Sequence, residues 1–231
     1  MNEVSKKYLI IIIIFLIVMI VALAFLFYYP KIFSVTKNKQ PATQTTPTNV
    51  IKFTMPEMAP KAVGYPEQDG NCFASSVAEP YRQDAFRCMV ENSIYDPCFS
   101  LTDASGQAQK GLVYCQVNPL KPDSFLIKLT KDLPKPEVPS TLQDNWAWFL
   151  TLKDGTQCSP FTGTRPFFGT GPDAQVAYYG CASKNVDEQV VLLGDLTKGN
   201  VWTAEEAILK TNGTNWAIIS TQKVEIDTIW K

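Results

Sequence analysis

The chain has 231 residues, a formal net charge of −1 and no histidine. The missing histidine excludes Ser-His-Asp and Cys-His catalysis and metal sites built on imidazole. Residues 51–231 carry 16 basic and 21 acidic side chains, a net charge of −5 without a basic run. This balance argues against a nucleic-acid partner, because neutralising phosphates needs clustered Lys and Arg.

The first predicted element is a transmembrane helix over Tyr8–Tyr29, which follows a polar tail of residues 1–7. Its 22 residues carry no charge, and as a helix they span about 33 Å, enough for a hydrocarbon core of roughly 30 Å. The alternative is a cleaved signal peptide, because residues 22–24 read Ala-Leu-Ala, a small-x-small cleavage site. The apolar run continues past that site, which favours a retained signal anchor. A cleaved leader would give a secreted protein.

Residues 30–50 form a predicted flexible linker, and 34–50 are rich in Thr, Gln, Asn and Pro. The folded domain is expected over residues 51–231. Lysines flank the apolar segment on both sides, so counting them does not orient it. All six cysteines lie beyond it, and disulfides persist in oxidising compartments. We therefore expect a single-pass cell-membrane protein with residues 1–7 in the cytoplasm and residues 51–231 outside.

Short alternating apolar runs predict a β-rich domain, all-β or α+β, with antiparallel sheets and at most two short helices. The expected strands cover residues 111–117, 124–130, 146–152, 175–181, 189–193, 216–221 and 224–230. The run at 124–130 places Phe125, Ile127 and Leu129 on one face. Residues 83–90 fit either a helix or a strand. Thr203–Leu209 predicts a short helix with Thr203 as its cap, and the last two runs predict a pair of final strands.

The six cysteines are spaced for disulfides and not for zinc. They are Cys72, Cys88, Cys98, Cys115, Cys158 and Cys181. Zinc sites usually pair cysteines two to four residues apart, whereas the intervals here are 15, 9, 16, 42 and 22 residues. A reactive thiol needs a base or a cationic neighbour, and Arg87 is a candidate cationic neighbour for Cys88. Fifteen pairings are open. Pairing of neighbours is favoured, because each bridge then closes a loop that constrains the unfolded chain by roughly 3 kcal/mol.

A spaced set of motifs runs from Gly70 to Trp202. It consists of Gly70-Asn71-Cys72, Asp84–Cys88, Asp96–Phe99, Val113–Cys115, Asp154–Cys158, Tyr179–Cys181, Leu193–Asp195 and Val201–Thr203. In these residues the chain is similar to a family of uncharacterised bacterial envelope and secreted domains with bridged cysteines. The resemblance implies an extracytoplasmic, disulfide-bonded domain behind a leader or an anchor. It carries no established activity and therefore transfers no functional residue.

Two places in the domain are candidate ligand surfaces. Phe167 and Phe168 lie in a glycine-rich stretch, where an exposed tip can bind a partner or a glycan; packing of one ring in the core is the simpler alternative. The second place consists of Arg87 and Asp96, and Arg87 lies in an apolar run, where it can clamp a ligand carboxylate. The simpler alternative for Arg87 is an ion pair with Asp84 or Asp96.

Acidic and tryptophan side chains are the remaining candidates. The candidates for an acid/base pair are the acids Asp96, Asp154, Asp195, Glu205 and Glu206. The candidates for stacking on sugars are Trp146, Trp148, Trp202, Trp216 and Trp230. Each of the three aspartates also has a structural explanation: Asp96 precedes a proline, Asp154 fits a turn and Asp195 follows a glycine. Packing in the core is the favoured role of the tryptophans.

These observations together favour a non-enzymatic recognition module for an envelope protein, a glycan or a cell-wall component, with no cofactor and no metal. One alternative is a carboxylate-dependent hydrolase of the envelope, which needs two acids about 5–10 Å apart in a pocket. A structural envelope protein that only assembles or spaces is the other alternative.

Overall fold

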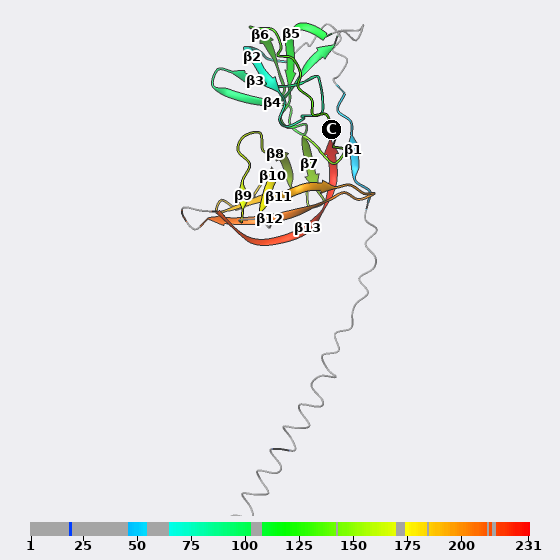
Figure 1. The fold of residues 1–231 in the computed structure, drawn as a ribbon, viewed down its shortest axis with the longest axis vertical. Coiled ribbons are helices and arrows are strands. Elements are labelled where there is room, and N and C mark those ends of the chain that lie inside the picture. The colour runs from blue at the N-terminus through cyan, green and yellow to red at the C-terminus, as the bar shows by residue number, and fades with distance from the viewer. Residues whose placement is uncertain are drawn as a thin grey trace, which may run out of the picture. The chain divides into compact units, whose positions relative to one another are not determined.

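A computed structural model describes residues 19, 46–54, 65–102, 108–141, 143–169, 174–183, 185–211, 213 and 216–231 (Figure 1). The chain divides into two compact units, Met1–Gln44 and Thr45–Lys231. Apart from Met19, the predicted tail and transmembrane segment lie outside the described residues, as do residues 30–45 of the predicted linker. Within the described ranges, no helix is long and apolar enough to cross a membrane.

The second unit contains a closed five-stranded barrel. Its strands are β2 (Glu67–Ser75), β3 (Ala85–Val90), β4 (Ser93–Thr102), β5 (Ala108–Cys115) and β6 (Phe125–Leu129). Each strand pairs antiparallel with the next, so the first and fifth run in the same direction. The barrel therefore closes through a parallel pair, β2 with β6. The ambiguous segment at residues 83–90 is thus a strand from Ala85 onward.

The same unit contains a second sheet of eight strands. They are β1 (Asn49–Ile51), β7 (Phe149–Leu152), β8 (Gln157–Pro160), β9 (Phe167–Phe168), β10 (Gln175–Cys181), β11 (Glu188–Thr197), β12 (Thr203–Thr211) and β13 (Trp216–Trp230). The order is β1-β13-β12-β11-β10-β8-β7, and β7 also pairs with β13, while β9 pairs with β10. Every regular element among the described residues 46–231 is a strand, so the prediction of a β-rich domain is confirmed.

Two predictions at the C-terminal end are wrong. Thr203–Leu209 forms a strand, β12, and not a helix, because β11 and β13 pair with both of its edges and tertiary pairing overrides a weak helix preference. The expected pair of final strands is one strand of 15 residues, β13. Its middle, Thr221–Lys223, contains no glycine or proline to turn the chain, so β13 continues from β12 to β1 and β7.

The end of the predicted linker belongs to the folded unit. Asn49–Ile51 pairs in parallel with β13. Thr48 is buried; its hydroxyl donates to the Ile226 carbonyl at 2.7 Å and accepts from the Trp202 backbone N–H at 2.7 Å. The folded unit therefore starts a few residues before the predicted boundary at residue 51.

Three disulfides join strands that pair with each other. Cys72 bonds to Cys88, Cys98 to Cys115 and Cys158 to Cys181, which is the neighbour pairing that the sequence favoured. The members of each pair are directly opposite in the strand register, where side chains are close enough to bond. The barrel bridges lie in its core with Phe86, Val113 and Ile127.

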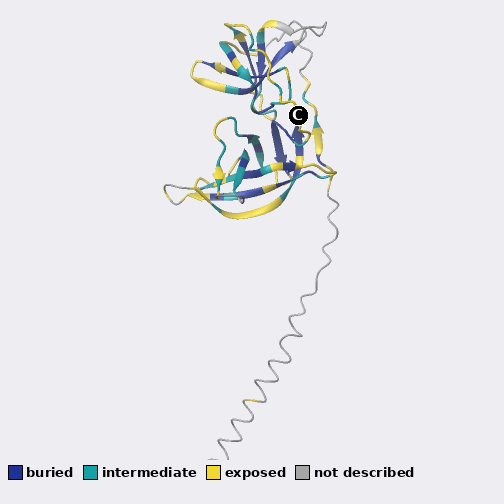
Figure 2. Cartoon of the chain, viewed as in Figure 1, coloured by how far each residue is buried: buried dark blue, intermediate teal, exposed yellow. Residues whose placement is uncertain are grey.

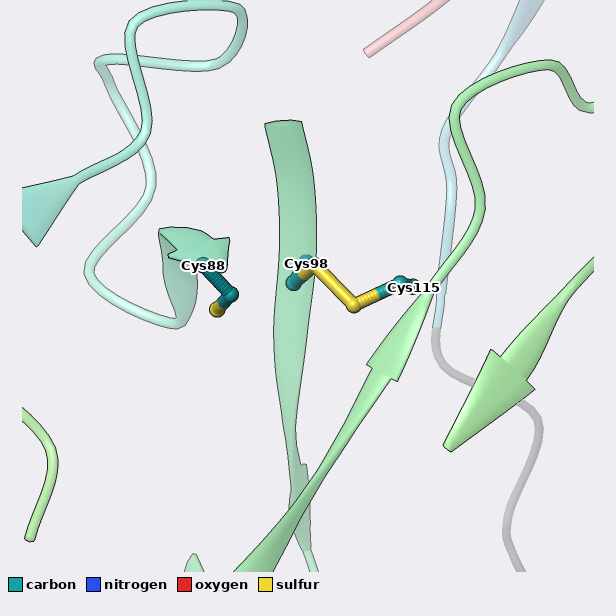
Figure 3. A group of neighbouring side chains, drawn as sticks. All are labelled: Cys88, Cys98 and Cys115. Carbon is teal, nitrogen blue, oxygen red and sulfur yellow. A yellow bond between two sulfur atoms is a disulfide. The ribbon is translucent and has the colours of Figure 1, made fainter. Parts of the chain in front are cut away.

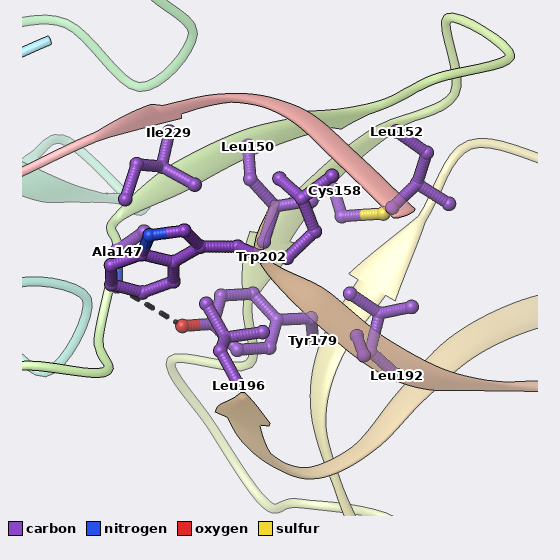
Figure 4. Packing of buried hydrophobic residues seen from close by; sticks show 11 residues of the cluster. Ala147, Leu150, Leu152, Cys158, Tyr179, Leu192, Leu196, Trp202 and Ile229 are labelled. Atoms are coloured by element: carbon purple, nitrogen blue, oxygen red, sulfur yellow. Dashed lines mark hydrogen bonds between the residues drawn. The ribbon is translucent and has the colours of Figure 1, made fainter. Parts of the chain in front are cut away.

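The larger sheet has its own core; Figure 2 colours the buried parts of its strands dark blue, and Figure 4 draws side chains of the core. The core packs Leu150, Tyr179, Leu192, Trp202 and Ile226 around the Cys158–Cys181 bridge. The Tyr179 ring is fully buried, and its hydroxyl accepts a hydrogen bond from the Ala147 backbone N–H at 3.2 Å. This hydrogen bond gives the buried hydroxyl a partner, without which its burial would cost free energy.

A third apolar cluster joins the barrel to the larger sheet. Phe99 and Leu126 of the barrel pack with Trp148, Phe149 and Trp230 of the sheet. Each large side chain buried in this way contributes roughly 1.5–3 kcal/mol. The two strand assemblies are therefore held in contact by a shared core.

Gly70 lies where β2 closes the barrel, and we predict that Gly70→Ala destabilises the fold. An added Cβ would lie 2.6 Å from the Met89 carbonyl oxygen and 3.0 Å from methyl carbons of Ile127 and Val90. Overpacking of this kind costs about 1–3 kcal/mol. Urea unfolding measures the loss; the control is Gly163→Ala, whose Cβ has nothing within 4 Å. Equal stability of the two variants would contradict the tight closure.

Candidate functional site

The loop between β2 and β3, residues 76–84, is held in place by the buried Asp96 carboxylate. Asp96 accepts hydrogen bonds from the Ser76 hydroxyl, the Val77 backbone N–H at 3.0 Å and the Ala78 backbone N–H at 3.3 Å. The Ser76 hydroxyl oxygen also accepts from the Glu79 N–H at 2.8 Å. These contacts determine where Glu79 and the residues after it lie.

Arg82 projects from this loop and is fixed on several sides. Its guanidinium donates to both carboxylate oxygens of Asp84, at 2.9 and 2.6 Å, and to the Phe53 carbonyl at 2.5 Å. It also stacks over the Phe99 ring, with 4.7 Å between Cζ and the ring centroid. The side chain is still 22% exposed, so it can meet a ligand without rearranging.

Arg82 borders an open groove of about 700 Å³ that we call the cationic groove. The groove is lined by Val50, Lys52, Phe53, Thr54, Arg82, Asp144, Lys198, Trp202 and Lys231. Four of these residues are cations and one is an acid. A site of this size and composition suits a ligand that carries negative charge.

Asp144 lies between two of the lysines. The Lys198 ammonium is paired with one of its carboxylate oxygens, and the Lys231 ammonium donates to the other at 2.8 Å. These hydrogen bonds, that of Lys198 first, lower the pKa of Asp144 to about 2. The Lys231 ammonium also lies over the Trp202 ring, 5.4 Å from its centroid. Because the Asp144 side chain is 69% exposed, a ligand anion can compete with it for both lysines.

Glu79 is a buried acid in the same loop as Arg82. Its side chain is 4% exposed, and its Oε2 atom has no hydrogen-bond partner. Burial raises the pKa of Glu79 to about 7, and the positive charges of Arg82 and Lys231 oppose that rise. Among the described groups, Glu79 is thus an acid that titrates near neutral pH next to two cations of the groove.

An aromatic cluster covers the other side of the loop. The Trp146 indole N–H donates to the Ala78 carbonyl at 2.7 Å. Its ring packs against Tyr179 and Tyr178, with centroids 5.4 and 6.2 Å apart, and the Arg165 guanidinium lies over Tyr178 at 4.6 Å. Trp146 is 5% exposed, so here it serves packing and does not present a sugar-stacking face. Trp148, Trp202 and Trp230 are buried as well, and Trp216 is 38% exposed.

The predicted ligand residues Arg87 and Asp96 do not border the groove. Asp96 is 6% exposed and its oxygens are occupied by the loop. Arg82, not Arg87, forms the ion pair with Asp84. The Arg87 guanidinium instead lies 5.9 Å from the centroid of the exposed Phe73 ring.

Phe167 and Phe168 form β9, and their side chains differ strongly in exposed fraction. Phe167 is 62% exposed, whereas Phe168 is half-buried and packs against the core cluster of Ala177 and Val191. One ring therefore packs inward, and the other remains available on the surface. The structure does not place either ring in the cationic groove.

Two of the predicted acids, Asp154 and Glu206, line one hollow of about 320 Å³ together with Glu225. Asp154 accepts from the backbone N–H and the hydroxyl of Thr156 in the β7–β8 turn, both at 2.9 Å. The buried Glu206 accepts from the Gln222 amide at 2.7 Å. Asp195 and Glu205 are exposed outside this hollow.

The sulfur atoms are the one metal-compatible group among the described residues. The Sγ atoms of Cys88, Cys98 and Cys115 lie within 4.8 Å of one another (Figure 3). All three belong to disulfides, and a disulfide sulfur is not the thiolate that binds metal.

Comparisons with protein-family models, curated proteins and solved structures find no match for this chain. The resemblance seen in the spaced motifs therefore stays a prediction.

The main site residues were not found from the sequence. Glu79 and Arg82 stand in the segment Glu-Pro-Tyr-Arg between two cysteines, where charge and proline are typical of any surface turn. Lys231 and Lys198 are separated from them by more than a hundred residues, so no local pattern joins the four side chains. The one usable signal was the charged segment inside an otherwise apolar, cysteine-rich stretch.

We predict that Glu79 makes folding stability fall as pH rises from 4.5 to 7. The folded state holds the Glu79 proton up to a pKa of about 7, whereas the ordinary value is 4.5. The native state therefore binds the proton more tightly than the unfolded state does. The stability that this binding provides, about 3 kcal/mol, is lost as the pH rises through that interval. Glu79→Gln should remove this part of the slope in urea unfolding measured from pH 4.5 to 8. Identical slopes in the variant and the wild type would contradict a buried, proton-binding Glu79.

Proposed function

We propose that this protein is a membrane-anchored, extracytoplasmic recognition module that binds an acidic polysaccharide of the envelope. The observation that carries the proposal is the cationic groove, which is lined by Lys52, Arg82, Lys198 and Lys231 and by a single acid, Asp144. This excess of cations would attract anions to the groove on a domain whose overall charge is negative.

The groove suits a polymer better than a small metabolite. It is partly open to solvent, and its cations come from four separate places: residue 52, the β2–β3 loop, residue 198 and residue 231. A ligand with carboxylates on successive sugars can meet several of these cations in turn. The half-buried Phe53 ring and the lysine stems offer apolar surface for sugar faces.

The location is proposed from the sequence together with the disulfides. Three disulfides without a free cysteine among the described residues suit an oxidising compartment. The apolar segment Tyr8–Tyr29 supplies the membrane attachment in this proposal. The domain would then act at the outer side of the cell membrane.

We predict that the folded unit binds oligogalacturonate, a carboxylate-bearing probe, and does not bind neutral dextran of equal length. Lys52→Ala combined with Lys198→Ala should weaken binding roughly threefold to tenfold, because each exposed charge contact is worth up to about 1 kcal/mol. Calorimetry at low salt measures the affinity, and added salt should weaken it. The matched control is Lys210→Ala with Lys223→Ala, two exposed lysines outside the groove.

Three outcomes would contradict this function. Equal binding by both double variants would place the site outside the groove. Release of new reducing ends from the probe, abolished by Glu206→Gln, would favour the hydrolase alternative at the hollow of Asp154 and Glu206. Absence of binding together with concentration-dependent self-association would favour a structural envelope protein.

We also predict that the full chain stays in the membrane fraction after alkaline washing, whereas a chain without residues 1–29 is released. The physical reason is the cost of moving the apolar segment Tyr8–Tyr29 from lipid into water. Protease added to intact cells should digest residues 46–231 if the domain faces outward. Protection from protease in intact cells, with digestion after lysis, would reverse the proposed orientation.

A further inference from the structure

Glu79 lies in the β2–β3 loop three residues before Arg82, which with Lys231 is one of the two least exposed cations of the cationic groove. We infer that Glu79 is the buried counter-charge of the groove, so that the groove holds anions more tightly when Glu79 carries a proton. This inference rests on the proposed function, because it concerns the regulation of the same site.

Glu79 is a buried acid on which two cations of the groove act electrostatically. Arg82 and Lys231 line the groove with side chains 22% and 24% exposed. Both act electrostatically on Glu79, Arg82 more strongly than Lys231. Glu79 itself is buried, and its Oε2 atom lacks a hydrogen-bond donor. Among the described residues neither cation forms an ion pair with Glu79, because Arg82 is paired with Asp84 and Lys231 with Asp144.

Other charged and titratable groups around Glu79 do not replace it in this role. From its own loop, Asp84 and Tyr81 act on it, and the Tyr81 backbone N–H donates a hydrogen bond to it. From β10, the buried Tyr179 hydroxyl interacts with it electrostatically, and burial raises the pKa of that tyrosine above its ordinary value. The chain contains no histidine, so no imidazole titrates between pH 6 and 8.

The sign of the effect follows from charge. Burial raises the pKa of Glu79 to about 7. At pH 8 the carboxylate is mostly ionised and offsets part of the positive potential that Arg82 and Lys231 present to the groove. At pH 6 it is mostly neutral, and the groove gains close to one positive charge. Anion binding must in return favour protonation of Glu79, because the coupling between two sites is reciprocal.

The experiment measures the affinity of the wild-type folded unit for oligogalacturonate at pH 6 and pH 8. The carboxylates of this probe stay ionised over that interval, so its own charge is constant. We expect binding to be roughly threefold to tenfold tighter at pH 6. Glu79→Gln should bind equally at both pH values, with the affinity that the wild type shows at pH 6. The control Glu205→Gln, an exposed acid outside the groove, should keep the wild-type ratio.

A second readout separates electrostatic coupling from a change of shape. Calorimetry at pH 7 in two buffers of different ionisation enthalpy should show proton uptake on binding by the wild type and none by Glu79→Gln. Wild-type binding with the same affinity at both pH values overturns the inference and leaves the groove in place as the binding site. A pH ratio that survives in Glu79→Gln also overturns it. Absence of wild-type binding at both pH values overturns the proposed function together with this inference.

Discussion

The candidate site depends on one buried carboxylate, that of Asp96. A buried carboxylate is costly unless donors surround it, and here the Ser76 hydroxyl and the backbone N–H groups of Val77 and Ala78 supply them. Burial raises the pKa of Asp96, and these hydrogen bonds act against that rise. These hydrogen bonds hold the start of the β2–β3 loop against β4. Everything that the loop carries is positioned by this contact.

From that point the loop connects the two strand assemblies. Its Ala78 carbonyl receives the Trp146 indole N–H of the larger sheet, and its Arg82 reaches the Phe53 carbonyl beside β1. The shared apolar cluster with Trp148 and Trp230 supports the same junction. The cationic groove is therefore formed by residues of both assemblies, and it exists only while the junction is intact.

Local patterns were sufficient where a single pair of neighbouring strands decides the structure. The alternation at residues 124–130 placed Phe125, Ile127 and Leu129 on one face, and all three pack in the barrel core. The favoured disulfide pairs are the ones that the structure contains, because each joins positions directly opposite in paired strands. The patterns were insufficient for Thr203–Leu209, whose helix-like composition is overridden by pairing on both edges.

The sequence by itself determined the β-rich character of the domain, the absence of imidazole chemistry and the even set of cysteines suited to bridging, since these depend on composition and short-range spacing. Only the tertiary structure decided that Arg82, Lys198 and Lys231 meet at one groove and that two of these cations act on the buried Glu79, while Arg87 and Asp96 do not line it. The physical reason is that the shared apolar cluster, together with the bond from Arg82 to the Phe53 carbonyl, brings the β2–β3 loop to the ends of β11 and β13, where residues 198 and 231 lie. Electrostatic coupling depends on distance in space, which the order of residues along the chain does not encode locally.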